Sequence, residues 1–326
     1  MHPQLEPTVC EPRHALETLD AWMVDGATLA EDTAPNLPEA HPLVGELLKG
    51  TYRVDGVIAH GGMASVLSAT HIRLRRAVAI KVLAEAYLRS EQRRQRFFAE
   101  AEIVAQLDHP HIVSVIDFDF AIGGRPFLVM ERLGGDSLAA RIHVGPMPPL
   151  AVLAVVRQVA SALTVAHAAG VVHRDLKPAN IMLADTGEPD VFTKLIDFGI
   201  SRSPGEGRRL TGHRDLLGTP HYMAPEQALS RHDCIGPRTD QYSLGVVAWE
   251  LLTGDLPFAG HQTVDVLASI VHEPLPRLEE RWPHPGASAV EAVLGRAMAK
   301  RPEDRFADVA AFAAALELVL NRRPSA

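Results

Sequence analysis

The chain has 326 residues, of which 47% are hydrophobic, 22% charged and 5% aromatic, and this composition excludes global disorder. Its formal net charge of -8 argues against nucleic acid as a partner, because binding to phosphate backbones needs a strongly positive face. Cys10 and Cys234 suggest neither a disulfide framework nor a zinc site, and no signal peptide or membrane span is recognisable, so we expect a cytoplasmic protein.

Residues 1–48 differ in composition from the rest of the chain. They are rich in proline and acidic residues, although Leu16, Leu19, Trp22 and Met23 follow helical spacing. A single short helix is marginal on its own and needs a surface to persist. We therefore expect a disordered extension, with a regulatory docking helix as the alternative.

Residues 51–130 show short β-type runs interrupted by one helix. The expected helix, about Glu91 to Gln106, places Phe97 and Val104 among charged residues, as in a helix packed on a small sheet. The expected strands are Tyr52 to Ala59, Ser65 to Thr70, Ala77 to Leu83, Val113 to Phe120 and Phe127 to Met130. These elements predict a small, β-rich N-terminal lobe.

A glycine-containing turn connects the first two expected strands. Its small residues would let backbone N–H groups approach phosphates. A glycine turn between strands is more often a plain hairpin, so the turn alone is a weak signal. The candidate nucleotide-contacting residues at the turn and in the following strand are Ala59, His60, Gly61, Gly62, Met63, Ala64 and Val66.

The third expected strand carries a lysine among apolar residues. Lys81, two positions after Ala79, would face inward toward a ligand or a counter-ion. An unpaired charge in a cleft is costly, and the following helix offers Glu100 and Glu102 on different faces as partners. The plain alternative is an ordinary edge-strand lysine.

After Gly134 and Gly135 the chain becomes mainly helical. The long apolar-periodic segments are Leu150 to Ala169, Asp240 to Leu252, Val264 to His272, Ala287 to Lys300 and Phe306 to Leu320. They predict a larger, helical C-terminal lobe. Clefts between domains are common ligand sites, so we expect the chemistry where the two lobes meet.

The most specific stretch of this lobe is residues 172–180. It reads VHRDLKPAN and matches H-R-D-x-x-x-x-N throughout. Asp175 can orient a substrate hydroxyl and accept its proton, and Asn180 offers a neutral oxygen to magnesium. Lys177 adds a positive charge near the transferred group. A chance loop of polar residues would not match at so many positions.

Two further motifs follow in order. Residues 194–196 form a short expected strand that leads into Asp197, Phe198 and Gly199, the D-F-G element whose carboxylate binds metal. Residues 224–226 match A-P-E. The order of these motifs reproduces a complete signature rather than a single tripeptide.

Together these motifs resemble the protein kinase family, and the GGM and YMAPEQ segments look most like its bacterial Hanks-type (eukaryotic-like) serine/threonine members. The resemblance runs from Tyr52 to about Leu320. It implies an α+β, two-lobed kinase fold over residues 49–321. The expected parts are an N-lobe at about 51–130, a hinge at 131–135 and a C-lobe at about 136–320.

The resemblance also implies roles for single residues. Its spacing favours Glu100 over Glu102 as the partner of Lys81, and Lys177 indicates serine/threonine rather than tyrosine specificity. The remaining implied roles are Met130 as gatekeeper, Glu131 and Leu133 in the adenine-binding hinge, Glu226 paired with Arg305, and Asp240 bracing the catalytic loop.

The segment between Asp197 and Glu226 resembles an activation loop. Arg174 directly precedes the catalytic aspartate, so a phosphate on this loop could bind to it and order the loop. The candidate autophosphorylation sites are Thr211 and Ser203. Thr219, in the tripeptide Gly218-Thr219-Pro220, is instead expected to contact the catalytic loop and shape the substrate groove. The alternative is that the hydroxyls merely solvate a mobile loop.

The activity implied by the resemblance is transfer of the ATP γ-phosphate to serine and threonine hydroxyls of protein substrates and of the kinase itself. The implied cofactors are ATP and Mg²⁺, with Mn²⁺ as a substitute. Similar kinases also dimerise through the N-lobe, which makes a dimer a further expectation.

Two other functions stay open. A pseudokinase would use the fold for binding, and its support is that Ala59 and Ala64 replace two glycines of the family's G-x-G-x-x-G pattern, which keeps only Gly61. A small-molecule phosphotransferase would share the two-lobed plan. Thr219 and the A-P-E segment argue against it, because in protein kinases these elements build a groove for an extended polypeptide.

Overall fold

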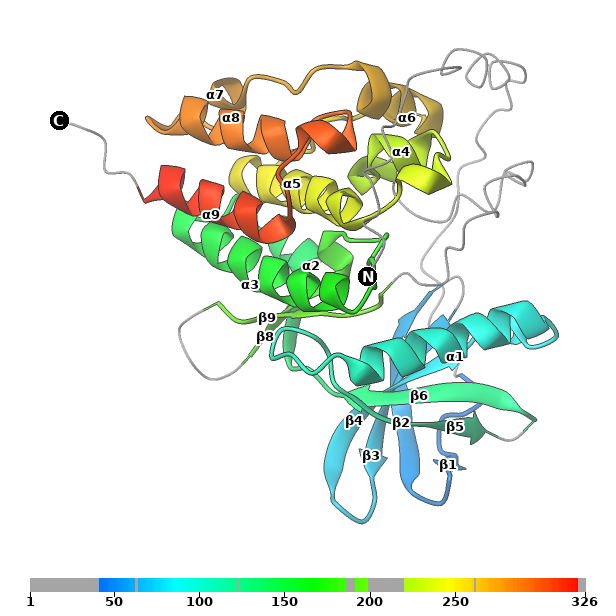
Figure 1. The fold of residues 1–326 in the computed structure, drawn as a ribbon. Helices are drawn as coiled ribbons and strands as arrows, with labels where there is room; N and C mark the ends of the chain where they lie inside the picture. Colours follow the sequence, from blue (N-terminus) through cyan, green and yellow to red (C-terminus); the bar gives the residue numbers. More distant parts are fainter. Residues whose placement is uncertain are drawn as a thin grey trace, which may run out of the picture. The chain divides into compact units, whose positions relative to one another are not determined.

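The computed structural model describes residues 41–61, 64–121, 123–185, 191–198, 220–260 and 262–321. The chain divides into a β-rich unit and a helical unit, with a boundary between Gly134 and Gly135, inside the expected hinge (Figure 1). This division gives the two lobes of the expected α+β fold.

The β-rich unit contains a six-stranded sheet in which every neighbouring pair is antiparallel. In sheet order the strands are β1 (Leu47–Leu48), β2 (Tyr52–His60), β3 (Ala64–His71), β4 (Arg76–Leu83), β6 (Arg125–Glu131) and β5 (Val115–Ala121). All five expected strands are present, with ends displaced by at most two residues. Lys49 beside β1 lies 3.0 Å from Asp117 of β5, the strand at the opposite edge. The sheet is therefore curled.

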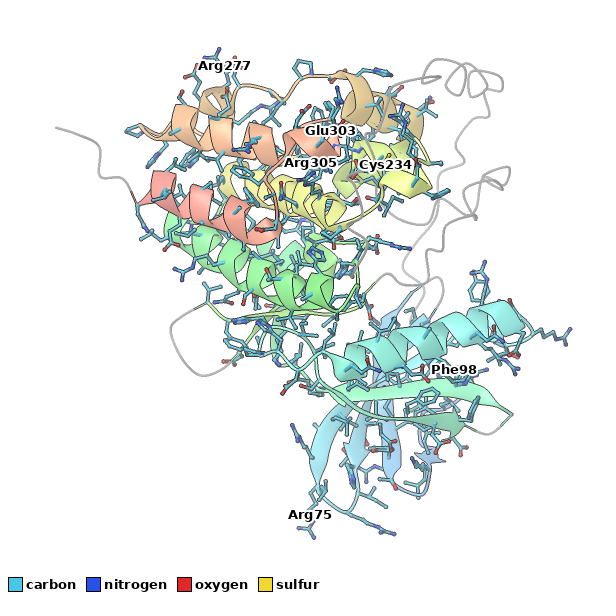
Figure 2. The ribbon with its side chains drawn as sticks, in the orientation of Figure 1. Arg75, Phe98, Cys234, Arg277, Glu303 and Arg305 are labelled. Atoms are coloured by element: carbon cyan, nitrogen blue, oxygen red, sulfur yellow. The ribbon has the colours of Figure 1, made fainter. Side chains whose placement is uncertain are left out.

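Helix α1 (Glu91–Gln106) has the expected bounds and packs on this sheet. Its N-terminus is capped by Ser90, whose hydroxyl accepts a hydrogen bond from the backbone N–H of Arg93. Phe97 packs with Leu83 and Leu128 of the sheet in a buried cluster. On α1, Phe98 is labelled in Figure 2, and its ring centroid lies 4.7 Å from that of Phe118. Aromatic packing therefore holds the helix against the sheet.

Residues 41–48 belong to the β-rich unit. Leu48 pairs with Tyr52 in the sheet, and Leu43 and Leu48 are both buried in its core. The expected domain start at residue 49 therefore lies just after β1, a strand that is too short for a sequence pattern to reveal. Residues 1–40, on which the expected disordered extension and the alternative docking helix fall, lie outside the described residues.

The helical unit contains all five long helices that the periodicity predicted. Two are shorter than expected: α8 ends at Ala297 and α9 begins at Val309, because the segment between them forms a turn and a 3-10 helix. The helices are α2 (Leu138–Ile142), α3 (Pro149–Ala168), α4 (Pro225–Ala228), α5 (Pro237–Thr253), α6 (Thr263–His272), α7 (Leu278–Arg281), α8 (Ala287–Ala297) and α9 (Val309–Leu320).

Short elements complete this unit, and most of them were not predicted. A small antiparallel sheet has the order β7 (Gly135–Ser137), β8 (Ile181–Ala184) and β9 (Thr193–Leu195). Among the described residues the 3-10 helices are η2 (Glu85–Tyr87) in the β-rich unit, and η3 (Pro178–Asn180), η5 (Pro220–Tyr222), η6 (His232–Cys234) and η7 (Pro302–Asp304) in the helical unit.

Helix α5 forms the centre of the helical unit, and every residue from Thr239 to Thr253 is buried. Helix α3 packs against both α5 and α9. Its length and apolar composition would allow α3 to cross a membrane, whereas the sequence analysis expected no membrane span. Half of the apolar window of α3 is buried inside the protein, as in the core helix of a folded domain.

Residues 109–112, which follow α1 in the chain, belong to the helical unit. The backbone N–H of Leu195 donates to the carbonyl of His111 over 2.8 Å, and His111 Nδ1 lies 2.9 Å from the Thr193 carbonyl oxygen. His109 Nε2 lies 3.0 Å from the hydroxyl of Ser161 on α3. Both histidines therefore have packing roles beside β9.

Leu48→Ala should lower the free energy of unfolding of the β-rich unit by about 2 to 3 kcal/mol, because it leaves a cavity in the core. The adjacent Leu47, with 48% of its surface exposed, provides a matched control. Leu47→Ala should cost less than about 0.5 kcal/mol. Urea unfolding of both variants measures the difference, and equal losses would show that residues 41–48 are not part of the core.

Candidate active site

The loop between α3 and β8 brings together two of the expected catalytic residues, Asp175 and Lys177, and the expected metal ligand Asn180. Lys177 Nζ lies 2.8 Å from Asp175 Oδ2, and both side chains are about three quarters buried. Asn180 donates from Nδ2 to the Asp175 carbonyl oxygen over 2.9 Å. Helix η3 (Pro178–Asn180) makes this short return possible, since its tight turn brings Asn180 back toward Asp175.

A buried carboxylate on α5 holds the start of this loop. Asp240 accepts hydrogen bonds from the backbone N–H groups of His173 and Arg174, each over 2.8 Å. His167 of α3 lies 2.7 Å from the same carboxylate. Asp240 is fully buried, so these donors replace the water that the charge would otherwise need. The expected brace is therefore a set of direct contacts from three donors.

His173 is completely buried beneath the loop. Its ring centroid lies 4.8 Å from that of Phe198, the residue after Asp197. Burial lowers the pKa of His173, so the ring is neutral at pH 7. A neutral ring can accept a hydrogen bond, and Nδ1 receives one from the backbone N–H of Asp175 over 3.3 Å.

Asn180 and Asp197 fit the chemistry of a magnesium site. The backbone N–H of Ile196 donates to the Asn180 carbonyl over 2.9 Å, which places Asp197, the next residue, close to Asn180 in the fold. The amide nitrogen of Asn180 is used in bonds to Asp175, which leaves its oxygen as the ligand atom. Carboxylate and amide oxygens are the ligands that hard cations prefer.

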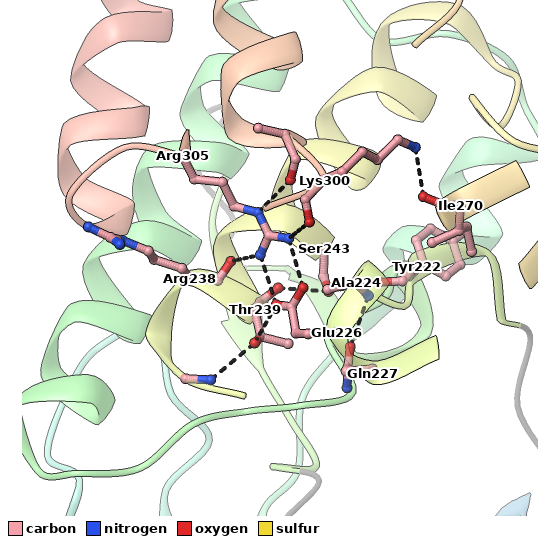
Figure 3. A network of polar contacts seen from close by, with 12 residues as sticks. Tyr222, Ala224, Glu226, Gln227, Arg238, Thr239, Ser243, Ile270, Lys300 and Arg305 are labelled. Carbon is pink, nitrogen blue, oxygen red and sulfur yellow. Dashed lines mark hydrogen bonds and ion pairs between the residues drawn. The ribbon is translucent and has the colours of Figure 1, made fainter. Parts of the chain in front are cut away.

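The A-P-E segment is fixed by a buried ion pair (Figure 3). Arg305 donates from Nη1 and Nη2 to the two carboxylate oxygens of Glu226, both over 2.8 Å. The hydroxyl of Thr239 donates to the same carboxylate over 2.8 Å. Arg305 also donates to the backbone carbonyl oxygens of Ala299 and Arg238. The resemblance implied the pair, whereas the contacts of Thr239 and the two carbonyls were not anticipated.

A small pocket lies beside the catalytic loop within the helical unit. Tyr222 of η5 lines it and donates through its hydroxyl to Glu250 of α5 over 2.7 Å. Burial raises the pKa of Glu250. The complete lining is Arg174, Asp175, Leu176, Lys177, Tyr222, Met223, Gln227 and Ser243. The pocket therefore joins the catalytic aspartate to the segment that precedes A-P-E.

In the β-rich unit, the sheet register separates the expected nucleotide-contacting residues into two faces. Val66 pairs with both Ala59 and Lys81, and directly paired residues share a face of a sheet. Ala64 and Ala79 lie on this same face by alternation. His60 pairs with Ser65 on the opposite face, and the two side chains are 3.3 Å apart. His60 can therefore contribute only its main chain to the Val66 face.

The turn between β2 and β3 explains the departure from the family's glycine pattern. The backbone N–H of Gly61 donates to the Ala64 carbonyl over 3.0 Å. A Cβ at Gly61 would lie 2.9 Å from that oxygen, so glycine is required there. Ala59 and Ala64 are not among the residues with positive φ, so alanine is unstrained at both positions.

The expected hinge residues lie at the end of β6. Met130 is buried and pairs with Ala79 of β4. Glu131 is the last residue of β6, and its carboxylate accepts a hydrogen bond from the backbone N–H of Ser114 over 2.7 Å. Leu133 is half-buried in the segment that follows. The gatekeeper and adenine-binding roles remain predictions.

Several expected site residues lie outside the described residues. Glu100 lies in α1, but its side chain is not described, so the pair with Lys81 remains a prediction; the competing Glu102 is exposed. The others are Gly62, Met63, Gly199, Ser203, Thr211 and Thr219.

The sequence analysis missed three residues that contact the site. His167 bonds to Asp240, Thr239 bonds to Glu226, and Gln227 bonds to the Arg174 carbonyl oxygen over 2.8 Å. No spacing rule connects His167 with a residue 73 positions away. Only the position of Gln227 directly after A-P-E could have drawn attention to it.

Glu226→Gln should lower the free energy of unfolding of the helical unit by about 3 kcal/mol or more, because it leaves the Arg305 charge buried without its partner. Glu303→Gln is the matched control, since the Arg301–Glu303 pair is largely exposed. It should cost less than about 1 kcal/mol. Calorimetry or urea unfolding separates the two, and a small loss for Glu226→Gln would contradict the importance of the buried pair.

Known proteins with similar sequences are bacterial kinases. Serine/threonine-protein kinase Pkn1 of Myxococcus xanthus is 41% identical over 295 residues, which are 90% of this chain and 42% of Pkn1. PknB of Mycobacterium leprae is 38% identical, with 85% of this chain and 44% of PknB covered. PknL of Mycobacterium tuberculosis H37Rv is 40% identical, with 85% and 68% covered. The chain thus spans about half the length of the first of these relatives.

A solved structure and a sequence family match the same region. The crystal structure of the Mycobacterium tuberculosis PknI kinase domain has a TM-score of 0.64 and 31% identity, and the match covers 84% of this chain and 98% of that domain. The family described as "Protein kinase domain" matches residues 52–316, which include every motif of the site. The chain therefore belongs to the protein kinase family.

Proposed function

We propose that this chain is a serine/threonine protein kinase that transfers the γ-phosphoryl group of ATP to hydroxyl groups of proteins. The observation that carries the proposal is the arrangement of Asp175, Lys177 and Asn180 on one short loop, with side chains in direct contact. The similarity to Pkn1, PknB and PknL supports the same activity.

The residues of the loop divide the chemistry of transfer between them. The Asp175 carboxylate would accept a hydrogen bond from the incoming hydroxyl, orient its oxygen toward the phosphorus and receive its proton. Lys177 Nζ, 2.8 Å from that carboxylate, would neutralise charge on the transferred group. Little covalent work remains for the protein, so alignment carries most of the rate enhancement.

The cofactor chemistry would be supplied by ATP with Mg²⁺ or Mn²⁺. Bound metal neutralises the phosphate oxygens and polarises the transferred group. Asn180 and Asp197 would hold the metal, and Lys81 would hold the phosphates. In the β-rich unit the main chain around Gly61 would cover the phosphates. Ala59 and Ala64 are compatible with this role, because neither is among the residues with positive φ.

A protein rather than a small alcohol is the substrate that the site favours. Tyr222 and Met223, just before A-P-E, lie beside Asp175, and by family resemblance the A-P-E segment builds a groove for the residues that flank the acceptor hydroxyl. A small-molecule phosphotransferase needs no such groove. By family resemblance Lys177 selects serine and threonine over tyrosine.

Asp175→Asn should reduce transfer of labelled γ-phosphate to casein by about 100- to 10,000-fold, because the amide cannot accept the hydroxyl proton. Asp255→Asn is the control, since Asp255 is exposed and outside the site, and it should leave the rate unchanged. Transfer is measured with ATP and Mg²⁺ on casein and on small alcohols. ATP binding without transfer by the parent chain would instead identify a pseudokinase, and preference for the alcohols would identify a small-molecule enzyme.

The same experiment tests autophosphorylation, which we also propose. Phosphate on Thr211 or Ser203 in the parent chain, and its loss in Asp175→Asn, would support a switch in which Arg174 binds the phosphate. Mass spectrometry assigns the modified residues. Transfer to casein with an unmodified loop would contradict the switch.

Self-association through the β-rich unit is a further part of the proposal. Its support is a set of exposed apolar side chains on this unit, with Leu74 70%, Leu47 48% and Ile116 41% exposed. Leu74→Asp should abolish a dimer, because it places a charge in a desolvated interface. Leu150→Asp is the matched control on α3, where the leucine is 64% exposed. Sedimentation measures both variants, and a monomeric parent would contradict the dimer.

A further inference from the structure

Arg174, directly before the catalytic aspartate, has a backbone conformation that needs support. Its φ of 63° lies in the left-handed region, which non-glycine residues seldom adopt unless their surroundings hold them there. Its N–H donates to Asp240 over 2.8 Å. Its carbonyl oxygen accepts a hydrogen bond from Nε2 of Gln227, also over 2.8 Å. Both backbone groups of Arg174 are therefore held by side chains from other elements.

The bond from Gln227 acts on the peptide group that connects Arg174 to Asp175. A peptide group is planar, so the direction of the Arg174 carbonyl fixes the direction of the Asp175 N–H. That N–H donates to His173 Nδ1 over 3.3 Å. Gln227 and His173 thus hold the two ends of one plane, and the Asp175 side chain projects from the Cα at its edge.

The other end of the Gln227 amide holds the first residue of A-P-E. Its Oε1 accepts a hydrogen bond from the backbone N–H of Ala224 over 3.0 Å, and this contact is drawn in Figure 3. Gln227 also lines the pocket shared by Asp175 and Tyr222. One half-buried side chain therefore joins the catalytic loop to the A-P-E segment.

The two bonds require different chemistry at the two ends of the side chain. The Arg174 carbonyl needs a donor, and the Ala224 N–H needs an acceptor. The glutamine amide supplies both, one on each of its two terminal atoms. Glutamate keeps the acceptor and loses the donor, and methionine has a similar length but makes neither strong bond.

We infer that Gln227 is a positioning residue for phosphoryl transfer: it fixes the peptide plane before Asp175 and couples that plane to the A-P-E segment. The inference rests on the proposed kinase function and extends it. Because Gln227 acts through Arg174 and Ala224 rather than on nucleotide, its loss should impair the transfer step and leave nucleotide binding intact.

The test compares Gln227→Glu and Gln227→Met with the parent in the full chain. Gln227→Glu should lower kcat for casein by about 10- to 100-fold, because small misplacements of a catalytic group have effects of this size. Its melting temperature should stay near that of the parent, since the acceptor for Ala224 is retained. Gln227→Met should show the same kcat loss with a lower melting temperature. For both variants the Kd of ADP with Mg²⁺, measured by calorimetry, should stay within about twofold of the parent.

Gln158 provides a matched control, because its amide makes the same two kinds of hydrogen bond to the main chain. Its Oε1 accepts from the Thr193 N–H over 2.7 Å, and its Nε2 donates to the Val191 carbonyl over 2.6 Å, away from the catalytic loop. Gln158→Glu should affect the melting temperature as Gln227→Glu does but leave kcat within about threefold. A comparable kcat loss in this control would show a general effect of glutamate and would overturn the inference.

Two other results would also overturn it. If Gln227→Glu keeps kcat within twofold of the parent, the donor is not needed to hold the Arg174 carbonyl. If its Kd for ADP weakens in step with kcat, the residue supports the fold of the whole site rather than the transfer step. A parent chain that transfers no phosphate at all would instead contradict the proposed function, and the inference with it.

Discussion

The buried carboxylate of Asp240 is the contact on which the geometry of the candidate active site depends. A charge in a fully buried position is stable only if hydrogen bonds replace its hydration. Two of its donors are the consecutive backbone N–H groups of His173 and Arg174. These bonds hold the start of the catalytic loop against α5, at the point where the backbone of Arg174 lies in the left-handed region.

A second buried charge, Glu226 of α4, has a related effect on the A-P-E segment. Glu226 is held by Arg305 and by Thr239, which lies next to Asp240 in the first turn of α5. The catalytic loop and the A-P-E segment are thus both attached to neighbouring residues of one rigid, buried helix. Gln227 then connects the two attached segments directly. Misplacing either segment would leave a buried polar group without its partner, so their relative position is strongly determined.

The sequence predicted the elements whose side chains have a period and the residues that belong to dense motifs. The long helices of the helical unit and five strands of the sheet were visible because one face of each is apolar over many residues. Strand β1 and the short helices α4 and α7 contain too few residues to show a period. Asp175 and Asn180 stood out because their motif fixes many positions at once. The contacts of His167 and Gln227 could not be predicted, because they join residues 73 and 53 positions apart and depend on how α3, α4 and α5 pack.

The turn between β2 and β3 shows how a departure from a family pattern should be weighed. The pattern counts glycines, but the backbone needs a glycine only where a Cβ would clash or φ is positive. At Gly61 a Cβ would come too close to the Ala64 carbonyl, whereas Ala59 and Ala64 have φ values that alanine adopts freely. The two alanines therefore fit the extended backbone of strands β2 and β3 without strain. A missing glycine indicates backbone strain only where the conformation requires one, and at these two positions it does not.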